Sequence, residues 1–576
     1  MTFTDLKAAS GDATLPASIW EYKQQGYVQV NSSWMYTCNY DVLTDSSNWT
    51  NHPCHSGWYP DALFDVPAGG IPLIPKGKTQ PIFIEACVPY GTAAGNYSGE
   101  FQLAGNGISY GISVDVEVWS IDIPKTNASD AFGTAFSWGS TGQWELEKWY
   151  GPQSRQLQNM TNAEIWRAWM PFLSKHRIPG DDWYNQAPRP TEEMLYRVET
   201  GSRQMNLMNS AFWSGSGIGP NGYNETVSKE MTAKILALLE PTIANLTAEG
   251  HFDKLVAYGF DEFCGRPKAG GCPGNQTIYD LYGALQNRWP GLKTMATLQW
   301  DSLPADLPVT IWVDEVSDYY DGEADPSKWP ASYKIPSEKE KARLAWLATG
   351  KEKEYWWYWC LDPEDDHYMN TFVERRVIDS RLLFWLAALH GIQGMLYYSV
   401  NNQWSQSCGE CATVAYHGVD PTPACKIGCG AGCPTLRDCQ TADMLRINNT
   451  ARTLFSPVGF HGPNNAPLAG GTNGGGQIVY PGIRGPIASN RLVNIADGIE
   501  DLQLFKMLGT GVSPAGAIIS HADDLIVQLV SNMSRGQPVS GVQVLPDPVR
   551  LEQVRREAAR RVMAQQRGEA DANFRS

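Results

Sequence analysis

Two adjacent carboxylates, Asp261 and Glu262, are the residues of this sequence best suited to acid–base chemistry. They end an apolar run that begins at Leu255 and has the character of a buried β-strand, and a loop rich in Gly, Pro and Cys follows at once. Barrels of parallel strands build active sites from acids at the carboxyl ends of strands. Successive side chains of a strand diverge, so the two acids should differ in surroundings and titration. The simpler interpretation is an exposed Asp-Glu pair at the end of a strand, which is a common feature. A perturbed acid in a cleft is a statistical indicator of a functional site and does not establish one.

The elements that must position these acids repeat as strand, loop and helix from about residue 130. Eight strand candidates occur, at residues 132–138, 176–183, 205–213, 255–262, 292–300, 309–313, 354–359 and 394–400. Stretches with apolar residues at helical spacing lie between most of them or after the last, at residues 161–175, 226–249, 337–349, 374–390 and 493–508. Strands that alternate with helices favour a parallel sheet, and eight repeats predict closure into a (β/α)8 TIM barrel.

The regions before and after this pattern differ from it. Residues 1–125 hold short alternating strands separated by Gly, Asn and Pro, which predicts an all-β sandwich. Residues 126–510 are the expected catalytic barrel, with a Cys- and Gly-rich insertion at 405–490 after strand eight. Residues 511–576 form a short helical tail whose end is expected to be disordered, and a solvated helix packed on the barrel explains its arginines better than a nucleic-acid segment does.

Composition narrows the class of partner. The net charge of -16 argues against nucleic acid or an anionic membrane, and the sequence contains no run of 18 apolar residues. The 22 Trp are more than one core needs, and several fall at or just past the carboxyl ends of predicted strands. Packing is the usual role of such a residue, whereas a ring of them around two acids would suit a sugar-binding cleft. No cofactor or metal is expected, and the oligomeric state is left open.

Cysteines and sequons indicate the compartment. The chain has 12 Cys and ten Asn-x-Ser/Thr sequons, which favours a secreted or secretory-pathway glycoprotein with disulfides. Cys264 and Cys272 bracket a tight loop after the acids and are expected to pair, as are Cys38 and Cys54. The six Cys between 408 and 439 favour disulfides over zinc, because only one Cys-x-x-Cys occurs among them. The first residues lack the basic and apolar regions of a signal peptide, so the sequence is expected to be trimmed at its start.

An ordered set of motifs resembles glycoside hydrolase family 123 and its uncharacterised relatives. The motifs are Gly57-Trp58-Tyr59-Pro60-Asp61, Tyr258-Gly259-Phe260-Asp261-Glu262, Ile311-Trp312-Val313, Tyr355-Trp356-Trp357-Tyr358, Arg381-Leu382-Leu383-Phe384-Trp385, the segment 391–398 and the segment 491–501. The resemblance covers roughly residues 20–510. It implies an N-terminal β-sandwich, a (β/α)8 barrel and a retaining β-N-acetylgalactosaminidase or related hexosaminidase. The Cys-rich insertion and the polar tail depart from the family pattern.

The resemblance also implies a mechanism and a set of site residues. In such enzymes the 2-acetamido oxygen of the substrate attacks the anomeric carbon, so no protein nucleophile is needed. Glu262 would be the general acid and then the base, and Asp261 would orient the acetamide. Tyr358 would donate to the acetamide carbonyl, and Trp404, Trp312 and Tyr398 are candidates for the hydrophobic floor and walls of the sugar site.

Two other classes stay open at this point. Asp314 and Glu315, at the tip of predicted strand six, would supply a second acid pair for a conventional two-carboxylate glycosidase. A non-catalytic glycan-binding protein that keeps the cleft is the other class, because a fold alone does not secure an activity.

Overall fold

The structure is a computed structural model that describes most of the chain, in segments. The described residues are 1–30, 57–66, 70–71, 74, 76–77, 79–105, 107–138, 162–184, 191–208, 222–263, 272, 274–316, 338–350, 352–360, 369–401, 474–482, 485–512, 518–532, 542–544 and 547–569.

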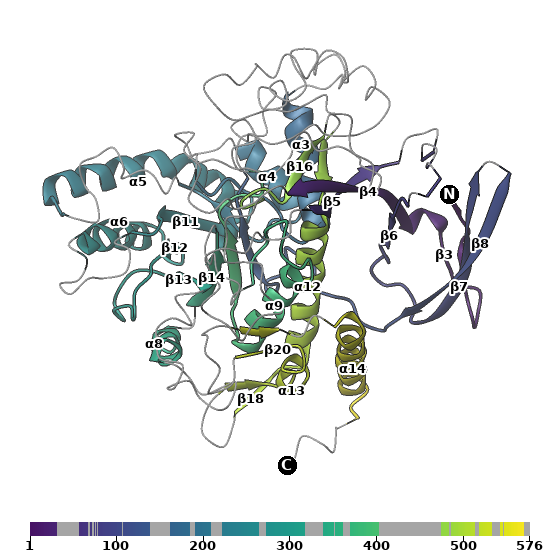
Figure 1. Ribbon diagram of the computed structural model, residues 1–576. Helices are drawn as coiled ribbons and strands as arrows, with labels where there is room; N and C mark the ends of the chain where they lie inside the picture. Colours follow the sequence, from purple (N-terminus) through teal and green to yellow (C-terminus); the bar gives the residue numbers. More distant parts are fainter. Residues whose placement is uncertain are drawn as a thin grey trace, which may run out of the picture.

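The N-terminal part consists of two antiparallel sheets (Figure 1). The first contains β1 (Thr2–Phe3), β2 (Leu6–Ala8), β3 (Thr14–Leu15), β7 (Gly95–Gly105) and β8 (Ile108–Val118). The second contains β4 (Trp20–Val30), β5 (Gly57–Asp65) and β6 (Ile82–Ala86). Leu6, Leu15, Ile19 and Tyr97 form a small apolar cluster. Residues from strands of both sheets pack against this cluster, which joins the two sheets.

The centre of the molecule is a seven-stranded parallel sheet. In spatial order its strands are β10 (Met205–Asn206), β11 (Leu255–Phe260), β12 (Lys293–Thr297), β13 (Ile311–Glu315), β14 (Glu354–Trp359), β15 (Gly394–Tyr397) and β9 (Gly133–Phe136). Every neighbouring pair is parallel, so all the carboxyl ends meet at one edge of the sheet. That edge is where loops can bring functional side chains together.

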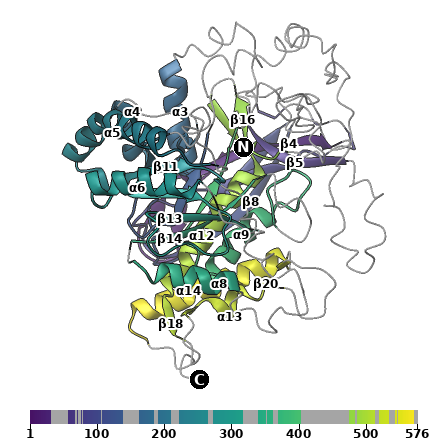
Figure 2. The same cartoon turned by 90° about the vertical axis from the view of Figure 1, so that its left-hand side faces the viewer.

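Helices cover the outer side of this sheet. They are α3 (Asn162–Lys175), α4 (Thr191–Glu199), α5 (Glu225–Ala248), α6 (Asn275–Arg288), α8 (Glu338–Leu347), α9 (Asp379–Leu389) and α12 (Asn490–Met507). Figure 2 shows α5 and α6 side by side next to β11, and α9 packs against α12. Two of these helices begin at an N-capping side chain: Asn224 caps α5, and Ser489 caps α12.

The remaining elements follow or flank α12. They are three short hairpins, β16 (Val479–Gly482) with β17 (Gly485–Ala488), β18 (Thr510–Val512) with β19 (Ile518–Ser520) and β20 (Val530–Asn532) with β21 (Val542–Val544), and the helices α13 (Asp523–Ile526) and α14 (Pro548–Gln566). Helix α14 buries the stripe Leu551, Val554, Ala558 and Val562. None of the described helices is both long enough and apolar enough to span a membrane.

The inner side of the parallel sheet has its own apolar cluster, here called the inner cluster. Its members are Ala135, Trp183, Val256, Tyr258, Met295, Ile311, Val313, Trp356, Tyr358 and Leu396. Alternation along each strand sends one set of side chains to the helices and the other set inward. Trp356 fills the inner space beside two strands that have glycine at the contact point. A Cβ atom at Gly133 or Gly394 would lie 2.2 Å from the Trp356 ring, so only glycine fits there. The interior is therefore packed solid at this level.

The predicted closed (β/α)8 barrel is wrong. The described sheet has seven strands and is open between β9 and β10, because the expected second strand at 176–183 contributes only one bridge, between Ser137 and Asp181. The cause is the side chain of Asp181. Its carboxylate accepts hydrogen bonds from the N–H groups of Asn206 (2.6 Å) and Asp182 (2.7 Å), and it pairs with Arg197 at 3.0 Å. The side chain of Asp181 thus accepts the hydrogen bond from the N–H of Asn206 in β10. In a continuous sheet, a backbone carbonyl of the neighbouring strand would accept that bond.

A buried ion pair joins the N-terminal sheets to the rest of the chain. Asp61 of β5 and Arg491 of α12 are each 1% exposed and lie 2.8 Å apart. Tyr480 donates to the same carboxylate at 2.5 Å. The guanidinium also donates to backbone carbonyls of Thr371, Gly474 and Gln477. Because each partner is enclosed and hydrogen-bonded, removal of one would leave the other as an uncompensated buried charge.

Candidate active site

Asp261 and Glu262 lie directly after β11, at the edge where the carboxyl ends of the parallel strands meet. All six residues of β11 are buried, whereas both acids keep exposed surface. The apolar run therefore makes a central strand, and the acids mark the point where the chain leaves the core. This is the position that the sequence predicts for them.

The carboxylate of Asp261 is held through one oxygen. Tyr258 donates to Oδ1 at 2.5 Å and Thr297 donates to the same atom at 2.8 Å. Among the described residues no donor reaches Oδ2, which is left to accept a hydrogen bond from a ligand. Desolvation raises the pKa of Asp261, and the negative charge of Glu262 adds to the rise, although the two hydrogen bonds oppose it.

The backbone of Glu262 adopts a left-handed conformation with φ of 46°. Only Arg177 shares a positive φ among the non-glycine residues that the structure describes. The conformation costs free energy for a residue with a Cβ atom, and such strain is concentrated at functional sites. The N–H of Glu262 donates to Thr297 Oγ1 at 2.6 Å, which fixes the turn. Thr297 thus contacts both acids.

The side chain of Glu262 is also held through one oxygen. The hydroxyl of Tyr358 donates to Oε1 at 2.7 Å, and Gln299 donates to that hydroxyl at 3.0 Å. Burial and the charge of Glu262 raise the pKa of Tyr358 far above its usual range, so the phenol keeps its proton and acts as a donor. No described donor reaches Oε2 of Glu262. Each acid therefore has one anchored oxygen and one open oxygen.

Aromatic residues on the inner side of the parallel sheet pack around Tyr258, which bonds Asp261. Tyr184 and Trp183 pack edge-on against Tyr258, with ring centroids 5.7 Å and 6.1 Å away. Burial raises the pKa of Tyr184, and the nearby charge of Asp261 raises it further. Cys360, one residue past β14, is partly buried against the same inner cluster. These groups lower the effective dielectric constant on the inner side of the two acids.

The aromatic residues predicted for the sugar site are found in different places. Tyr358 reaches Glu262, as described above. Trp312 instead lies on the helix side of β13, fully buried, where its indole N–H donates to the carbonyl of Leu298 at 2.7 Å. Tyr398 follows β15 and packs edge-on against Tyr397, with centroids 5.4 Å apart. Trp404 lies outside the described residues.

The Trp residues at the strand tips pack in the core where the structure describes them. They are Trp138, Trp183, Trp300 and Trp359, each at most 6% exposed. Trp183 belongs to the inner cluster, and the others belong to the main core between the sheet and the helices. For these four the packing interpretation holds, and they do not form an open ring around the acids.

The second acid pair is split between the two sides of β13. Asp314 is fully buried, and its Oδ2 accepts a hydrogen bond from Tyr355 at 2.7 Å within the core. Glu315 is level with Tyr358 on the neighbouring strand, and its charge contributes to the raised pKa of that phenol. Glu315 is therefore the member of this pair that lies near the candidate site.

The described residues include only part of what the cysteine predictions require. Cys272 is buried and disulfide-bonded, but Cys264, Cys38 and Cys54 lie outside the described residues, so both pairings stay predictions. The insertion 405–490 is described only from residue 474 onward. In the described part of the chain no group of three or more His, Cys, Asp and Glu could hold a metal ion.

Sequence reasoning missed four residues around the acids. Tyr258 and Thr297 bond Asp261, Gln299 bonds Tyr358, and Tyr184 packs against Tyr258. Tyr258 and Thr297 lie on the inward-facing side of their strands, and Gln299 follows β12 by two residues. The signal that could have found Thr297 is a hydroxyl residue at the end of a strand next to β11. A threonine in a strand is ordinarily read as a β-favouring residue, which hides that signal.

Part of the chain matches a known protein family. Residues 328–423 match the family model for the glycoside hydrolase 123 catalytic domain. This segment is less than half of the chain, and over it the sequence is similar to the catalytic domain of family 123 glycoside hydrolases. Tyr358, Tyr398 and Trp404 lie within the matched segment, whereas Asp261 and Glu262 precede it. No curated protein matches the sequence.

Solved structures agree with this relationship at the level of the fold. A family 123 glycoside hydrolase from Clostridium perfringens, reported in a study of glycolipid glycan hydrolysis, aligns with a TM-score of 0.56 at 11% identity. The alignment covers 99% of this chain and 89% of that chain. A β-glucuronidase from Parabacteroides merdae aligns over 62% of this chain and 38% of its own at 10% identity, but the TM-score of 0.22 is too low to indicate a shared fold. The predicted resemblance to family 123 is confirmed.

Proposed function

We propose that this family 123 relative hydrolyses terminal β-linked N-acetylhexosamine, with N-acetylgalactosamine preferred, by a retaining and substrate-assisted mechanism. The observation that carries the proposal is the arrangement of Asp261 and Glu262. Each carboxylate is anchored through one oxygen and leaves the other open at the carboxyl edge of the sheet. Two acids with separate anchors can take separate roles.

Asp261 is the residue that orients the acetamide group. Its Oδ1 is fixed by Tyr258 and Thr297, so Oδ2 can accept the acetamide N–H without movement of the side chain. As the acetamide oxygen bonds to the anomeric carbon, positive charge develops on the acetamide nitrogen. An ionised carboxylate in a low-dielectric site stabilises that charge.

Glu262 is the residue that moves protons. Because Tyr358 donates to Oε1, the transferable proton belongs on Oε2, which faces no described donor. In the first step that proton passes to the glycosidic oxygen while its bond to the anomeric carbon breaks. In the second step water attacks the anomeric carbon, gives a proton to Glu262 and restores the acetamide. No protein nucleophile is required.

The experiment compares nitrophenyl β-N-acetylgalactosaminide, β-N-acetylglucosaminide and plain β-galactoside as substrates for the wild type, Glu262→Gln and Asp261→Asn. We expect turnover of the acetamido sugars alone and a loss of about 10²- to 10⁴-fold in each variant. A thiazoline analogue of the oxazolinium intermediate should inhibit competitively. Equal turnover of the plain galactoside would overturn acetamide participation and direct attention to Glu315 as the second carboxylate of a conventional mechanism.

A binding measurement separates hydrolysis from the glycan-binding alternative. If no aryl glycoside is cleaved, Glu262→Gln and the wild type should be compared on a glycan array. Equal binding of larger glycans by both proteins without cleavage would overturn the enzyme proposal. The ten sequons also lead us to propose a secretory-pathway location, which a shift in mass after treatment with an N-glycan-cleaving enzyme would test.

A further inference from the structure

Strand β8 forms an edge of the five-stranded N-terminal sheet. It pairs with β7 over its whole length, from Gly95 opposite Val118 to Gly105 opposite Ile108. No other strand in the described part of the chain pairs with it. The backbone N–H and C=O groups along its outer side are therefore open to another strand. The β7–β8 hairpin projects from the molecule on the side away from the parallel sheet (Figure 1).

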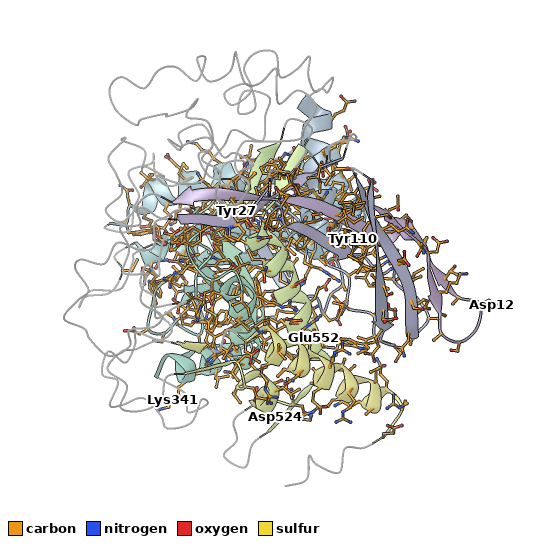
Figure 3. The ribbon with its side chains drawn as sticks, turned by 45° about the vertical axis from the view of Figure 1, so that its right-hand side comes forward. Asp12, Tyr27, Tyr110, Lys341, Asp524 and Glu552 are labelled. Atoms are coloured by element: carbon orange, nitrogen blue, oxygen red, sulfur yellow. The ribbon has the colours of Figure 1, made fainter. Side chains whose placement is uncertain are left out.

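One half of β8 is covered and the other half is not. Near its end, Val116 and Val118 pack on the small N-terminal core, and Glu117 forms an ion pair with Arg556 of α14 at 2.7 Å. The first half presents Ile108, Tyr110 and Ile112 on one face, which are 55%, 61% and 43% exposed. Figure 3 labels Tyr110 on this hairpin. These are among the most exposed large apolar residues that the structure describes.

The uncovered half lacks the features that normally keep strand edges apart. Residues 108–113 contain no charged residue and no proline. The pairing with β7 runs through eleven residue pairs without a shift in register, so no bulge twists the edge away. Native edge strands usually carry at least one of these protections. An edge without them is suited to pairing with another strand.

The sequence of this segment is complementary to itself. We propose that β8 pairs in antiparallel fashion with β8 of a second copy of this chain, about a two-fold axis at Tyr110. Residue numbers across the pair then add up to 220. Ile108 of one copy lies opposite Ile112 of the other, Tyr110 lies opposite Tyr110, and Ser109 lies opposite Gly111. Opposed residues share a face, so the exposed apolar side chains cover each other.

This arrangement makes a closed dimer. An interface between identical patches about a two-fold axis is isologous and leaves no further edge for growth along β8. Two five-stranded sheets would join into one continuous sheet through main-chain hydrogen bonds, the mode known as β-augmentation. The pairing involves five residues of each copy, fewer than the roughly 20–30 residues a side of a standard stable interface. We therefore expect a dimer that dissociates reversibly on dilution.

Light scattering and sedimentation of the full chain over a concentration series test the proposal. The wild type should approach twice the 63.7 kDa of one chain at high concentration. The double variant Tyr110→Lys, Ile112→Lys should stay monomeric, because like charges then oppose across the axis. Val549→Lys is the matched control, since Val549 is an apolar residue of α14 that is 66% exposed, and it should dimerise as the wild type does.

Cysteine cross-linking tests the register. Tyr110→Cys should form a covalent dimer on mild oxidation, above the background of the wild type. Ile108→Cys and Ile112→Cys should each fail alone and cross-link when the two variants are mixed. A wild type that is monomeric at every concentration, a dimer that persists in the double lysine variant, or cross-linking of Ile112→Cys alone would each overturn the proposal.

Discussion

The hydroxyl of Tyr358 donates to Oε1 of Glu262 across 2.7 Å, which ties the end of β14 to the turn after β11. The two residues are 96 positions apart in the chain, and two intervening strands separate β11 from β14 in the sheet. Thr297 of β12 supports the same turn from below, through the N–H of Glu262. The position of the proposed acid therefore depends on contacts with two other strands.

Tyr358→Phe should lower kcat while the fold is kept. The ring stays in place, but Glu262 loses the donor that fixes its Oε1, and a misplaced catalytic group costs on the order of 10²-fold in rate. Steady-state kinetics with an acetamido glycoside measure the effect. Tyr279→Phe, which removes a hydroxyl on α6 that bonds Asp306, is the control and should change kcat by less than about twofold. Equal kinetics for both variants would contradict a positioning role for Tyr358.

Thr297→Val should lower both the catalytic activity and the free energy of unfolding. The change preserves shape but removes one oxygen that bonds Asp261, Glu262 and Tyr258. We expect a loss of about 1–3 kcal/mol in the free energy of unfolding, because buried groups lose their partner. Urea unfolding measures it, and Thr297→Ser should restore both activity and stability. Thr277→Val is the matched control, because the hydroxyl of Thr277 is buried on α6 without a partner.

Asp261→Asn should stabilise the fold at neutral pH while it removes activity. The pKa of Asp261 is raised in the folded protein, so the folded state binds the proton more tightly than the unfolded state. Stability is therefore lost as the pH rises from the ordinary aspartate pKa of about 4 through the raised value. The amide cannot ionise and avoids this loss. Melting temperatures from pH 3 to pH 8 should show a gain for Asn that grows with pH; a gain independent of pH would refute this explanation.

Asp61→Ala should destabilise the protein by about 3–5 kcal/mol, because Arg491 would keep a buried charge without its partner. Denaturant unfolding measures the change. Asp524→Ala removes a comparable Asp–Arg contact at the surface, with Arg561 at 2.7 Å, and should cost less than about 1 kcal/mol. Adding Arg491→Met to Asp61→Ala should recover part of the loss. Equal losses for Asp61→Ala and Asp524→Ala would show that burial does not govern the ion pair.

The elements around the acids were predictable because their signals are local. The run 354–359 was expected as a strand and is β14, and the apolar run before Asp261 is β11. The run 176–183 also looked like a strand, but the side chain of Asp181 takes the hydrogen bonds that a strand would use, and its contacts with Asn206 and Arg197 are remote in sequence. Nothing in the local pattern reveals that competition.

The contents of the site were less predictable than its location. Asp261 and Glu262 could be recognised because they are adjacent, whereas their partners come from other strands. Trp312 was assigned to the sugar site, yet it pairs in register with Tyr355 and so faces the helices, whereas Tyr358 faces inward. Which face of a buried strand points inward depends on packing that a continuous apolar run does not encode.

The packing of the Trp356 ring over Gly394 and Gly133 has a consequence for comparisons among relatives. The three positions lie on β9, β14 and β15, far apart in sequence, yet they share one volume. A larger residue at either glycine position is compatible with this backbone only if the residue at 356 becomes smaller. We therefore expect these three positions to vary jointly in an alignment of related sequences, although none of them touches the acids.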